Sequence, residues 1–250
     1  MALIETDSVV LKTYDLSEAD KIVVLLTHDN GVVRGVAKGA KRLKSKFGSG
    51  LEPFSFVRVT YFQKDAVELV SIQKIELVHS NFTAASNPDF LQKFAYLGEL
   101  LVSLTPPHDP NPTLYRMVKA SVEAAAEDPE NLLSTSVYFE LWLIRLAGYL
   151  PDWSKCDSCG RVFDDPEETN LTANFHLMCV RCRRSAATRA VGGACRSLVA
   201  EAMRLTPVEF AKQTAGKHDD LSHLSTVLKQ MISVSIGREA IGETSLAISI

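Results

Sequence analysis

Two pairs of cysteines in the second half of the chain have the spacing of a metal site. Cys156 and Cys159 are separated by two residues, as are Cys179 and Cys182, and 19 residues (160–178) lie between the pairs. Two thiolates on one tight turn can bind the same tetrahedral ion, and a second such turn completes a shell of four sulfur ligands. The spacing therefore predicts one structural Zn²⁺ per chain, in a closed shell with no position for a catalytic water.

His176 and Cys195 are the other residues nearby that could bind a metal. His176 could replace one cysteine as a ligand, but the complete quartet makes this unnecessary. Cys195 shares a helical face with Leu198 and Met203, which favours a small buried apolar residue over a ligand. The alternative for the quartet is a set of free thiols, reduced or oxidised. Five cysteines and no export signal at the N-terminus disfavour a disulfide framework and favour the cytoplasm.

A basic segment in the first quarter of the chain is the second feature with chemical meaning. The whole sequence has a net charge of −3, but residues 31–64 hold eight basic residues and one acid, Glu52, for a local charge of +7. Such charge density binds phosphate backbones through counterion release. The alternative is a solvated loop that keeps the protein soluble. The residues predicted to contact nucleic acid are Arg34, Lys38, Lys41, Arg42, Lys44, Lys46 and Arg58.

Short β-branched runs in the first eighty residues predict the elements that carry the basic segment. Strands are expected at 9–11, 22–26, 32–36, 54–62 and 67–77. In the fourth run, Val57, Val59 and Tyr61 share one face by the period of two. Five short strands with no long helix between them indicate a small OB-type barrel, although an SH3-like barrel would give nearly the same pattern.

Helical periodicity replaces the strand pattern after Asn87-Pro88, an N-cap followed by proline at the first helical position. The third helix is apolar almost all round, so we expect it to be the buried centre of its domain. Helices are expected at 90–104, 113–126, 132–147, 196–205 and 221–235. The sequence thus predicts an α+β multidomain protein: an OB-fold barrel at 1–80, then an all-α domain at 81–250 with a zinc module inserted at about 153–190.

The sequence contains no catalytic motif that we recognise. Neither Lys38-Gly39 nor Gly216-Lys217 belongs to a phosphate-binding loop, and there is no HExxH or GxGxxG pattern. The six histidines are scattered, and none pairs with a serine or cysteine in a nucleophile motif. No apolar run approaches the roughly 18 residues of a membrane span. We therefore expect a protein that is not an enzyme and that binds neither nucleotides nor membranes.

Several segments near the N-terminus match one known family. They are Val-Leu-Lys-Thr at 10–13, Glu-Ala-Asp-Lys-Ile-Val at 18–23 and the glycine- and lysine-rich stretch at 31–42, continued at 44–47 and 51–54. With a barrel, a helical domain and a four-cysteine module in the same order, the chain resembles the RecO family of bacterial recombination mediators over nearly its whole length. Not every member keeps the cysteines, so the zinc prediction rests on their spacing in this sequence.

The resemblance implies a non-enzymatic function in DNA repair and homologous recombination. Members bind single- and double-stranded DNA and anneal complementary strands. With RecR, and in some pathways RecF, they help a RecA-type recombinase displace the single-stranded-DNA-binding protein, SSB. The stretch from Arg34 to Lys46 matches the basic barrel loop of the family, so the resemblance implies DNA contacts at Arg34, Lys38, Lys41, Arg42, Lys44 and Lys46. The resemblance also implies a bacterial cytoplasmic protein that associates with the nucleoid.

The family also binds the acidic, phenylalanine-ended C-terminal tail of SSB on its helical domain. Arg116, Lys119 or Arg145 could supply the cationic rim of such a pocket, but each is also explained as an ordinary surface charge. Two other classes of function fit the same residues. One is a zinc-containing protein-interaction adaptor with incidental nucleic-acid binding, and the other is an RNA-binding zinc-ribbon protein.

Overall fold

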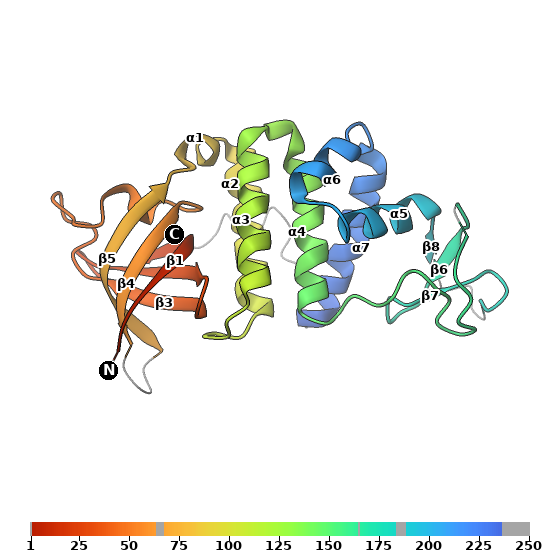
Figure 1. Ribbon diagram of the computed structural model, residues 1–250, viewed down its shortest axis with the longest axis horizontal. Coiled ribbons are helices and arrows are strands. Elements are labelled where there is room, and N and C mark those ends of the chain that lie inside the picture. The colour runs from red at the N-terminus through yellow and green to blue at the C-terminus, as the bar shows by residue number, and fades with distance from the viewer. Residues whose placement is uncertain (1, 64–67, 165, 184–188, 237–250) are drawn as a thin grey trace. The chain divides into compact units, whose positions relative to one another are not determined.

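The computed structural model describes residues 2–63, 68–164, 166–183 and 189–236 (Figure 1). The chain forms two compact units. The first includes residues up to Leu132 and the second begins at Leu133. None of the described helices is long and apolar enough to cross a membrane.

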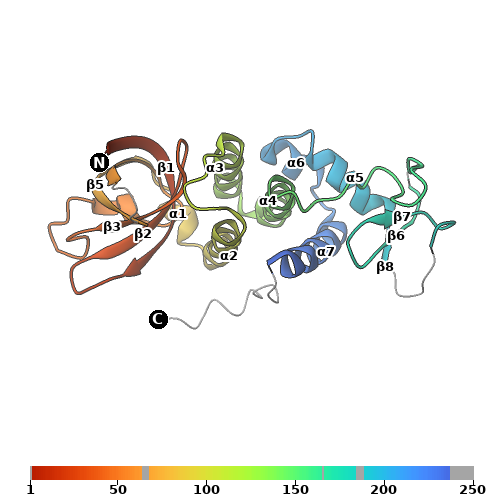
Figure 2. The ribbon, with the colours of Figure 1, turned by 90° about the horizontal axis from the view of Figure 1, so that it is seen from below.

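Five strands close into a barrel at the start of the first unit (Figure 2). Their order is β1-β2-β3-β5-β4; β3 pairs with β5 in parallel and every other pair is antiparallel. This is a five-stranded Greek-key barrel of the OB type, as predicted. The strands are β1 (Ala2–Asp15), β2 (Lys21–Thr27), β3 (Gly31–Ala37), β4 (Phe56–Gln63) and β5 (Leu69–His79).

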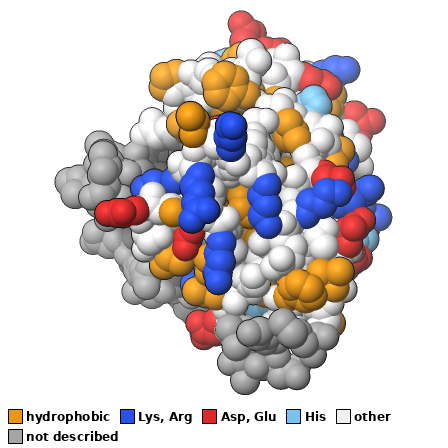
Figure 3. Space-filling view, turned by 90° about the vertical axis from the view of Figure 1, so that its left-hand side faces the viewer, with side chains coloured by type: hydrophobic (Ala, Val, Ile, Leu, Met, Phe, Trp, Pro, Cys, Tyr) orange, Lys and Arg blue, Asp and Glu red, His pale blue; other side chains and the backbone are white. Residues whose placement is uncertain are grey.

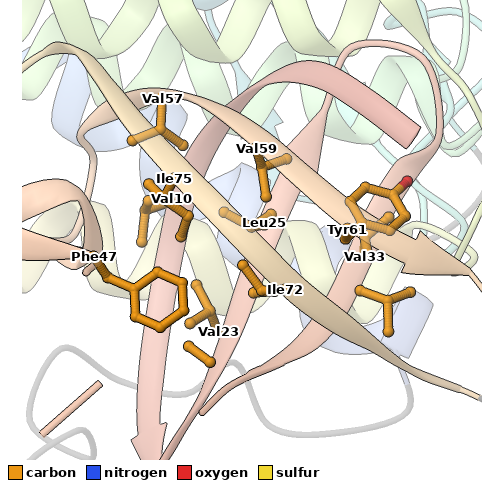
Figure 4. Close-up of a cluster of buried hydrophobic side chains, with 12 residues drawn as sticks. Val10, Val23, Leu25, Val33, Phe47, Val57, Val59, Tyr61, Ile72 and Ile75 are labelled. Carbon is orange, nitrogen blue, oxygen red and sulfur yellow. The ribbon is translucent and has the colours of Figure 1, made fainter. Parts of the chain in front are cut away.

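The barrel interior follows the predicted alternation of side chains. Val57, Val59 and Tyr61 of β4 are all buried and point into the core cluster, as Figure 4 shows. Phe47 fills the same core from the loop between β3 and β4 and is only 3% exposed. The loop then makes a short 3₁₀ turn, η1 (Gly48–Leu51), in which a Cβ on Gly50 would lie 2.6 Å from Cγ2 of Ile75. Close packing at these two positions fixes the C-terminal end of this loop on the barrel.

Two long helices complete the first unit. After the one-turn helix α1 (Phe82–Ala85) come α2 (Pro88–Leu104) and α3 (Pro112–Glu127), followed by a 3₁₀ turn, η2 (Pro129–Asn131). The predicted cap is present, because the Asn87 side chain accepts a hydrogen bond from the Asp89 N–H. The fourth strand was expected to begin at Phe54 but begins at Phe56, because Phe54 has a φ of 62° and this interrupts the extended backbone. Its ring packs edge-on against Phe90 and Phe94 of α2, which joins helix and barrel.

The second unit is helical, with a small sheet inserted. Its helices are α4 (Leu132–Leu146), α5 (Gly193–Ala202), α6 (Pro207–Gln213) and α7 (His218–Ile236), and its sheet has the order β7-β6-β8. The sheet strands are β6 (Thr169–Leu171), β7 (Leu177–Met178) and β8 (Arg189–Val191). As predicted, α4 is buried around most of its surface. Two hydrogen bonds tie it to the end of α5 and the segment that follows: the Tyr138 hydroxyl donates to the Leu205 carbonyl at 3.0 Å, and Trp142 Nε1 donates to the Ala202 carbonyl at 2.9 Å.

Candidate metal centre and nucleic-acid interface

The four cysteines meet in one place in the second unit. Their Sγ atoms all lie within 4.8 Å of one another, in the segment between α4 and α5. Four sulfurs at about 2.3 Å from a tetrahedral ion would be roughly 3.8 Å apart, so small side-chain movements suffice to bind one. These four cysteines could hold a metal ion, and four thiolates are a donor set typical of the structural zinc that the spacing predicts.

Each cysteine pair is placed by a backbone turn. In the first turn the Cys156 N–H donates to the Arg161 carbonyl at 2.8 Å, and the Gly160 N–H donates to the Cys156 carbonyl at 2.8 Å. Gly160 has a φ of +71°, the left-handed conformation that glycine adopts without strain. The second turn follows β7, and its Cys182 N–H donates to the Cys179 carbonyl at 3.1 Å.

The thiols of the cluster differ in acidity. Burial raises the pKa of the Cys156 thiol, but hydrogen bonds from backbone N–H groups, first that of Cys179, outweigh burial and lower the pKa to about 6. Hydrogen bonds with Cys179 and Cys159 raise the pKa of Cys182 to about 12, because the protonated Cys182 thiol is stabilised by donating to the neighbouring sulfurs. Without a cation, the cluster therefore keeps at least one proton among its sulfurs. A divalent ion would displace that proton and offset part of the thiolate charge.

The two alternative ligands lie apart from this cluster. His176 Nδ1 is 2.9 Å from a carboxylate oxygen of Asp157, and the group of metal-ligating atoms does not include the histidine. Cys195 is 2% exposed on α5, with its Sγ 3.7 Å from Nδ1 of His223. It is the small buried residue that its helical face predicts.

We refer to residues 153–191 as the cysteine module. Trp153 precedes the first cysteine pair and Phe175 precedes the second. The indole N–H of Trp153 donates to the Phe175 carbonyl at 2.9 Å, which links the two parts of the module. Arg196 of α5 donates through Nη2 to the carbonyl oxygens of Asp164 and Glu167, at 2.9 and 2.7 Å. The three short strands of the module gave no sequence signal that we recognised, because runs of two or three residues are too short to show a period.

The central part of the basic segment, residues 38–47, forms an exposed loop between β3 and η1. Lys38, Arg42, Lys44 and Lys46 are exposed, and so is Arg34 on β3. Figure 3 shows Lys and Arg side chains gathered on the face of the barrel that is turned toward the viewer. The base of the loop rests on the β1–β2 turn, where the Gly39 N–H donates to a carboxylate oxygen of Asp20 at 2.8 Å. Lys64, counted in the segment, lies outside the described residues.

Two predicted DNA contacts are engaged within the protein. Lys41 Nζ lies 2.7 Å from a carboxylate oxygen of Asp15, and Arg58 Nε lies 3.0 Å from one of Asp7. The hydrogen bond from Lys41 is the main cause of a lowered pKa at Asp15, and the bond to Asp7 raises the pKa of Arg58. Among the residues that the structure describes, no carboxylate forms an ion pair with Lys38, Arg42, Lys44 or Lys46.

The three candidate partner residues have different surroundings. Arg116 is exposed, with Nη2 3.4 Å from the Thr113 hydroxyl. Lys119 is 3.9 Å from the Glu123 carboxylate, with its ammonium group 5.5 Å from the ring centre of Phe56. Both belong to α3 in the first unit. Arg145, in the second unit, lies against the ring of Trp142 at 4.8 Å.

Arg145 also lines a cavity in the second unit. The cavity has a volume of about 580 Å³, and we call it the Arg145 cavity. A second guanidinium, that of Arg196, lies on its wall, and Asp152 on the same lining is 3.2 Å from Lys155 Nζ. The apolar part of the lining includes Leu150, Trp153, Phe163 and Val199. Sequence reasoning missed this cavity because it joins residues that are about fifty positions apart.

Comparison with known proteins gives a consistent result. The family model described as "Recombination protein O N terminal" matches residues 1–81, and "Recombination protein O C terminal" matches residues 94–243. A protein named DNA repair protein RecO from Koribacter versatilis is 33% identical over 189 residues, 74% of each chain. Proteins with the same name from Geobacter metallireducens (31% over 183 residues, 73% of this chain and 74% of the other) and Syntrophotalea carbinolica (26% over 238 residues, 91% and 89%) are similar as well.

Proposed function

This chain belongs to the RecO family of DNA repair proteins, and from that premise we propose that it is a recombination mediator. It binds single- and double-stranded DNA, anneals complementary strands and, with RecR, helps to load a RecA-type recombinase onto DNA coated with SSB. The role is non-enzymatic and takes place in the bacterial cytoplasm at the nucleoid. The single observation that carries the proposal is the exposed basic segment on an OB-type barrel.

The basic segment supplies the DNA contact. Lys38, Arg42, Lys44 and Lys46 project from one loop, so each can bind a phosphate without giving up an ion pair within the described residues. Arg34 adds a charge from β3. Phosphate contacts carry no sequence information, so the protein grips any strand and base pairing selects the register. Lower repulsion between two phosphate chains favours annealing, and this step needs no ATP.

Lys41 and Arg58 bind DNA at a cost that the other residues avoid. Each must exchange a carboxylate partner, Asp15 or Asp7, for a phosphate oxygen. Both pairs are solvent-exposed, and exposed ion pairs contribute only about 0.2–1 kcal/mol, so the exchange is small in energy. We therefore assign these two residues secondary contacts at the edge of the DNA site.

The cysteine quartet holds one structural Zn²⁺ per chain in this proposal. Cys156, Cys159, Cys179 and Cys182 supply four thiolates, the donor set that zinc prefers in closed sites. When bound, the ion supplies folding free energy and fixes the two turns relative to each other. All four positions are then occupied by sulfur, so no water is activated and no catalytic step is assigned to the metal.

The Arg145 cavity is the proposed site for the SSB tail. A phenylalanine-ended acidic peptide needs an apolar pocket for its ring and cations for its terminal carboxylate and acidic residues. Trp153 and Phe163 offer the apolar wall, and Arg145 with Arg196 offers the cations. Arg116 and Lys119 are weaker candidates, since Lys119 already lies near the Glu123 carboxylate. We expect contacts with RecR, and in some pathways RecF, at surfaces that we do not assign.

Salt dependence of DNA binding tests the basic segment. Replacing Lys38, Lys41, Arg42, Lys44 and Lys46 by Gln should weaken binding to all sequences alike. If all five contact single-strand phosphates, the slope of log affinity against log salt falls by about 3.5, at about 0.7 per contact. A matched control replaces five basic residues elsewhere, namely Arg116, Arg183, Arg204, Lys212 and Lys217. Equal salt slopes in the two variants would refute the assignment of the loop.

A further inference from the structure

The walls of the Arg145 cavity come from two sources. Trp153 and Phe163 belong to the cysteine module and stand on either side of the first cysteine pair in sequence. Arg145 and Arg196 come from α4 and α5. The order of the wall formed by Trp153 and Phe163 therefore depends on the turn that holds Cys156 and Cys159.

Backbone hydrogen bonds connect that wall directly to the cysteines. The Phe163 N–H donates to the Ser154 carbonyl at 3.0 Å, and Lys155 pairs with Val162 in an antiparallel bridge. The next hydrogen bond inward joins Cys156 to Arg161 at 2.8 Å. The two arms of the turn thus carry the cavity residues, and its closed end carries the cysteines. Fixing the cysteines fixes the spacing of the arms.

The described part of the cysteine module contains little regular secondary structure. Its three strands contain only three, two and three residues. With about 40 residues in all, it is of a size at which metals or disulfides usually supply the missing stability. The hydrogen bond from Trp153 to Phe175 links its two halves on one side. A metal shared by both cysteine pairs would link them on the other.

Arg196 connects the module to the opposite wall. Its guanidinium lies 5.0 Å from the ring centre of Phe163 and donates to the carbonyl oxygens of Asp164 and Glu167. Both acceptors are backbone atoms of the module, so their positions depend on the fold of that segment. A disordered module would release the Arg196 side chain along with the apolar wall.

From this geometry we propose that metal binding at the four cysteines controls the affinity of the Arg145 cavity for the SSB tail. The ion fixes the turn that presents Trp153 and Phe163, so the cavity exists in the metal-loaded protein and is lost on metal release. This inference rests on the proposed tail site. Because linkage is reciprocal, the peptide must also raise the affinity for the metal by the same factor.

The first experiment measures peptide binding by fluorescence anisotropy on the full chain. The probe is an Asp-rich peptide with a free C-terminal Phe, and the control peptide ends in Ala. The protein is compared zinc-loaded, stripped with a chelator and reloaded, with the metal content of each sample measured. We expect stripping to weaken probe binding at least tenfold and reloading to restore it, while affinity for single-stranded DNA changes less than twofold.

Hydrogen exchange separates a local change from general unfolding. Metal removal should speed exchange of the amides of Cys156 and Phe163, whereas amides in α4 and α7 keep their protection. A third measurement determines the zinc affinity with and without saturating probe, and we expect the probe to raise it by the factor found by anisotropy.

Three results would overturn the inference, and they are distinct. Equal probe affinity in the zinc-loaded and fully stripped protein would show that the cavity does not depend on the metal, leaving the tail site itself intact. Absence of probe binding to the zinc-loaded protein would remove the tail site and the inference together. Loss of protection in α4 and α7 on stripping would also contradict a local effect of the metal.

Discussion

The indole N–H of Trp153 donates to the carbonyl oxygen of Phe175 at 2.9 Å, and the bond joins the two halves of the cysteine module. Trp153 is 4% exposed, so the bond is shielded from water. Phe175 has a φ of 62°, a left-handed conformation that costs a residue other than glycine roughly 1–3 kcal/mol. The hydrogen bond helps to hold this turn, which leads into the strand before the second cysteine pair.

Replacing Trp153 by Phe should therefore weaken the metal site from a distance. The change leaves the part-buried Phe175 carbonyl without its donor, and the loss of such a hydrogen bond costs about 0.5–1.5 kcal/mol. We expect lower zinc affinity, measured by competition with a chromophoric chelator. Trp142→Phe is the matched control, because it removes a bond of the same length to the Ala202 carbonyl, outside the module. Equal zinc affinities in the two variants would contradict this account.

Substitution of a ligand should release the metal altogether. We expect elemental analysis to find one ion per chain in the native protein and none in Cys156→Ser, with a lower midpoint of thermal unfolding, because a closed site contributes folding free energy. Cys195→Ser changes another buried thiol and should keep its ion. A Cys156→Ser protein that lacks metal but unfolds at the native temperature would show that the site has no structural role.

The ion pair between Asp15 and Lys41 predicts a gain of function. Asp15→Asn removes a carboxylate 2.7 Å from Lys41 Nζ and leaves that ammonium available to a phosphate. Exposed pairs contribute about 0.2–1 kcal/mol, so affinity for single-stranded DNA at low salt should rise by up to about fivefold. Glu127→Gln at the end of α3 removes the same charge outside the basic segment and should have a smaller effect. Unchanged binding in Asp15→Asn would place Lys41 outside the DNA site.

The cap of α6 predicts a dependence of stability on pH. Hydrogen bonds from Thr206, first from its backbone N–H at 2.9 Å, lower the pKa of Glu209 below its ordinary value. The ionised carboxylate therefore stabilises the fold at neutral pH, and this contribution disappears as the pH falls through the lowered pKa. Glu209→Gln can keep a capping box without titrating. In urea unfolding, the free energy of unfolding of the native protein should exceed that of this variant at pH 7, and the difference should shrink as acid protonates Glu209. A difference that stays constant as the pH falls would contradict the assignment.

Much of the fold was predictable because its signals are local. Alternation of Val57, Val59 and Tyr61 predicted their burial in β4, and Asn87-Pro88 predicted the start of α2. The cysteine spacing likewise predicted that four thiols would meet, since each pair sits on its own turn.

The remaining features depend on contacts between distant residues. The sequence pattern places Phe54 in a strand. In the structure its φ is positive and its ring packs against Phe94 of α2, a contact that the local pattern cannot show. Periodicity cannot show that Lys41 lies beside Asp15, because their 26-residue separation closes only in the barrel. The Arg145 cavity is hidden for the same reason. The short helix α6, with its capping box at Thr206, was detectable from the Thr-Pro-x-Glu pattern and was missed.

Strand annealing tests the central claim most directly. Two complementary oligonucleotides carrying a fluorophore and a quencher are coated with SSB and mixed with the full chain, without ATP. The account predicts that the chain accelerates annealing well above the rate without it. Replacing the five residues of the basic segment named above, Lys38, Lys41, Arg42, Lys44 and Lys46, by Gln should remove most of this acceleration. Annealing no faster than that of SSB-coated strands alone would contradict a mediator and leave the protein-interaction adaptor as the better description.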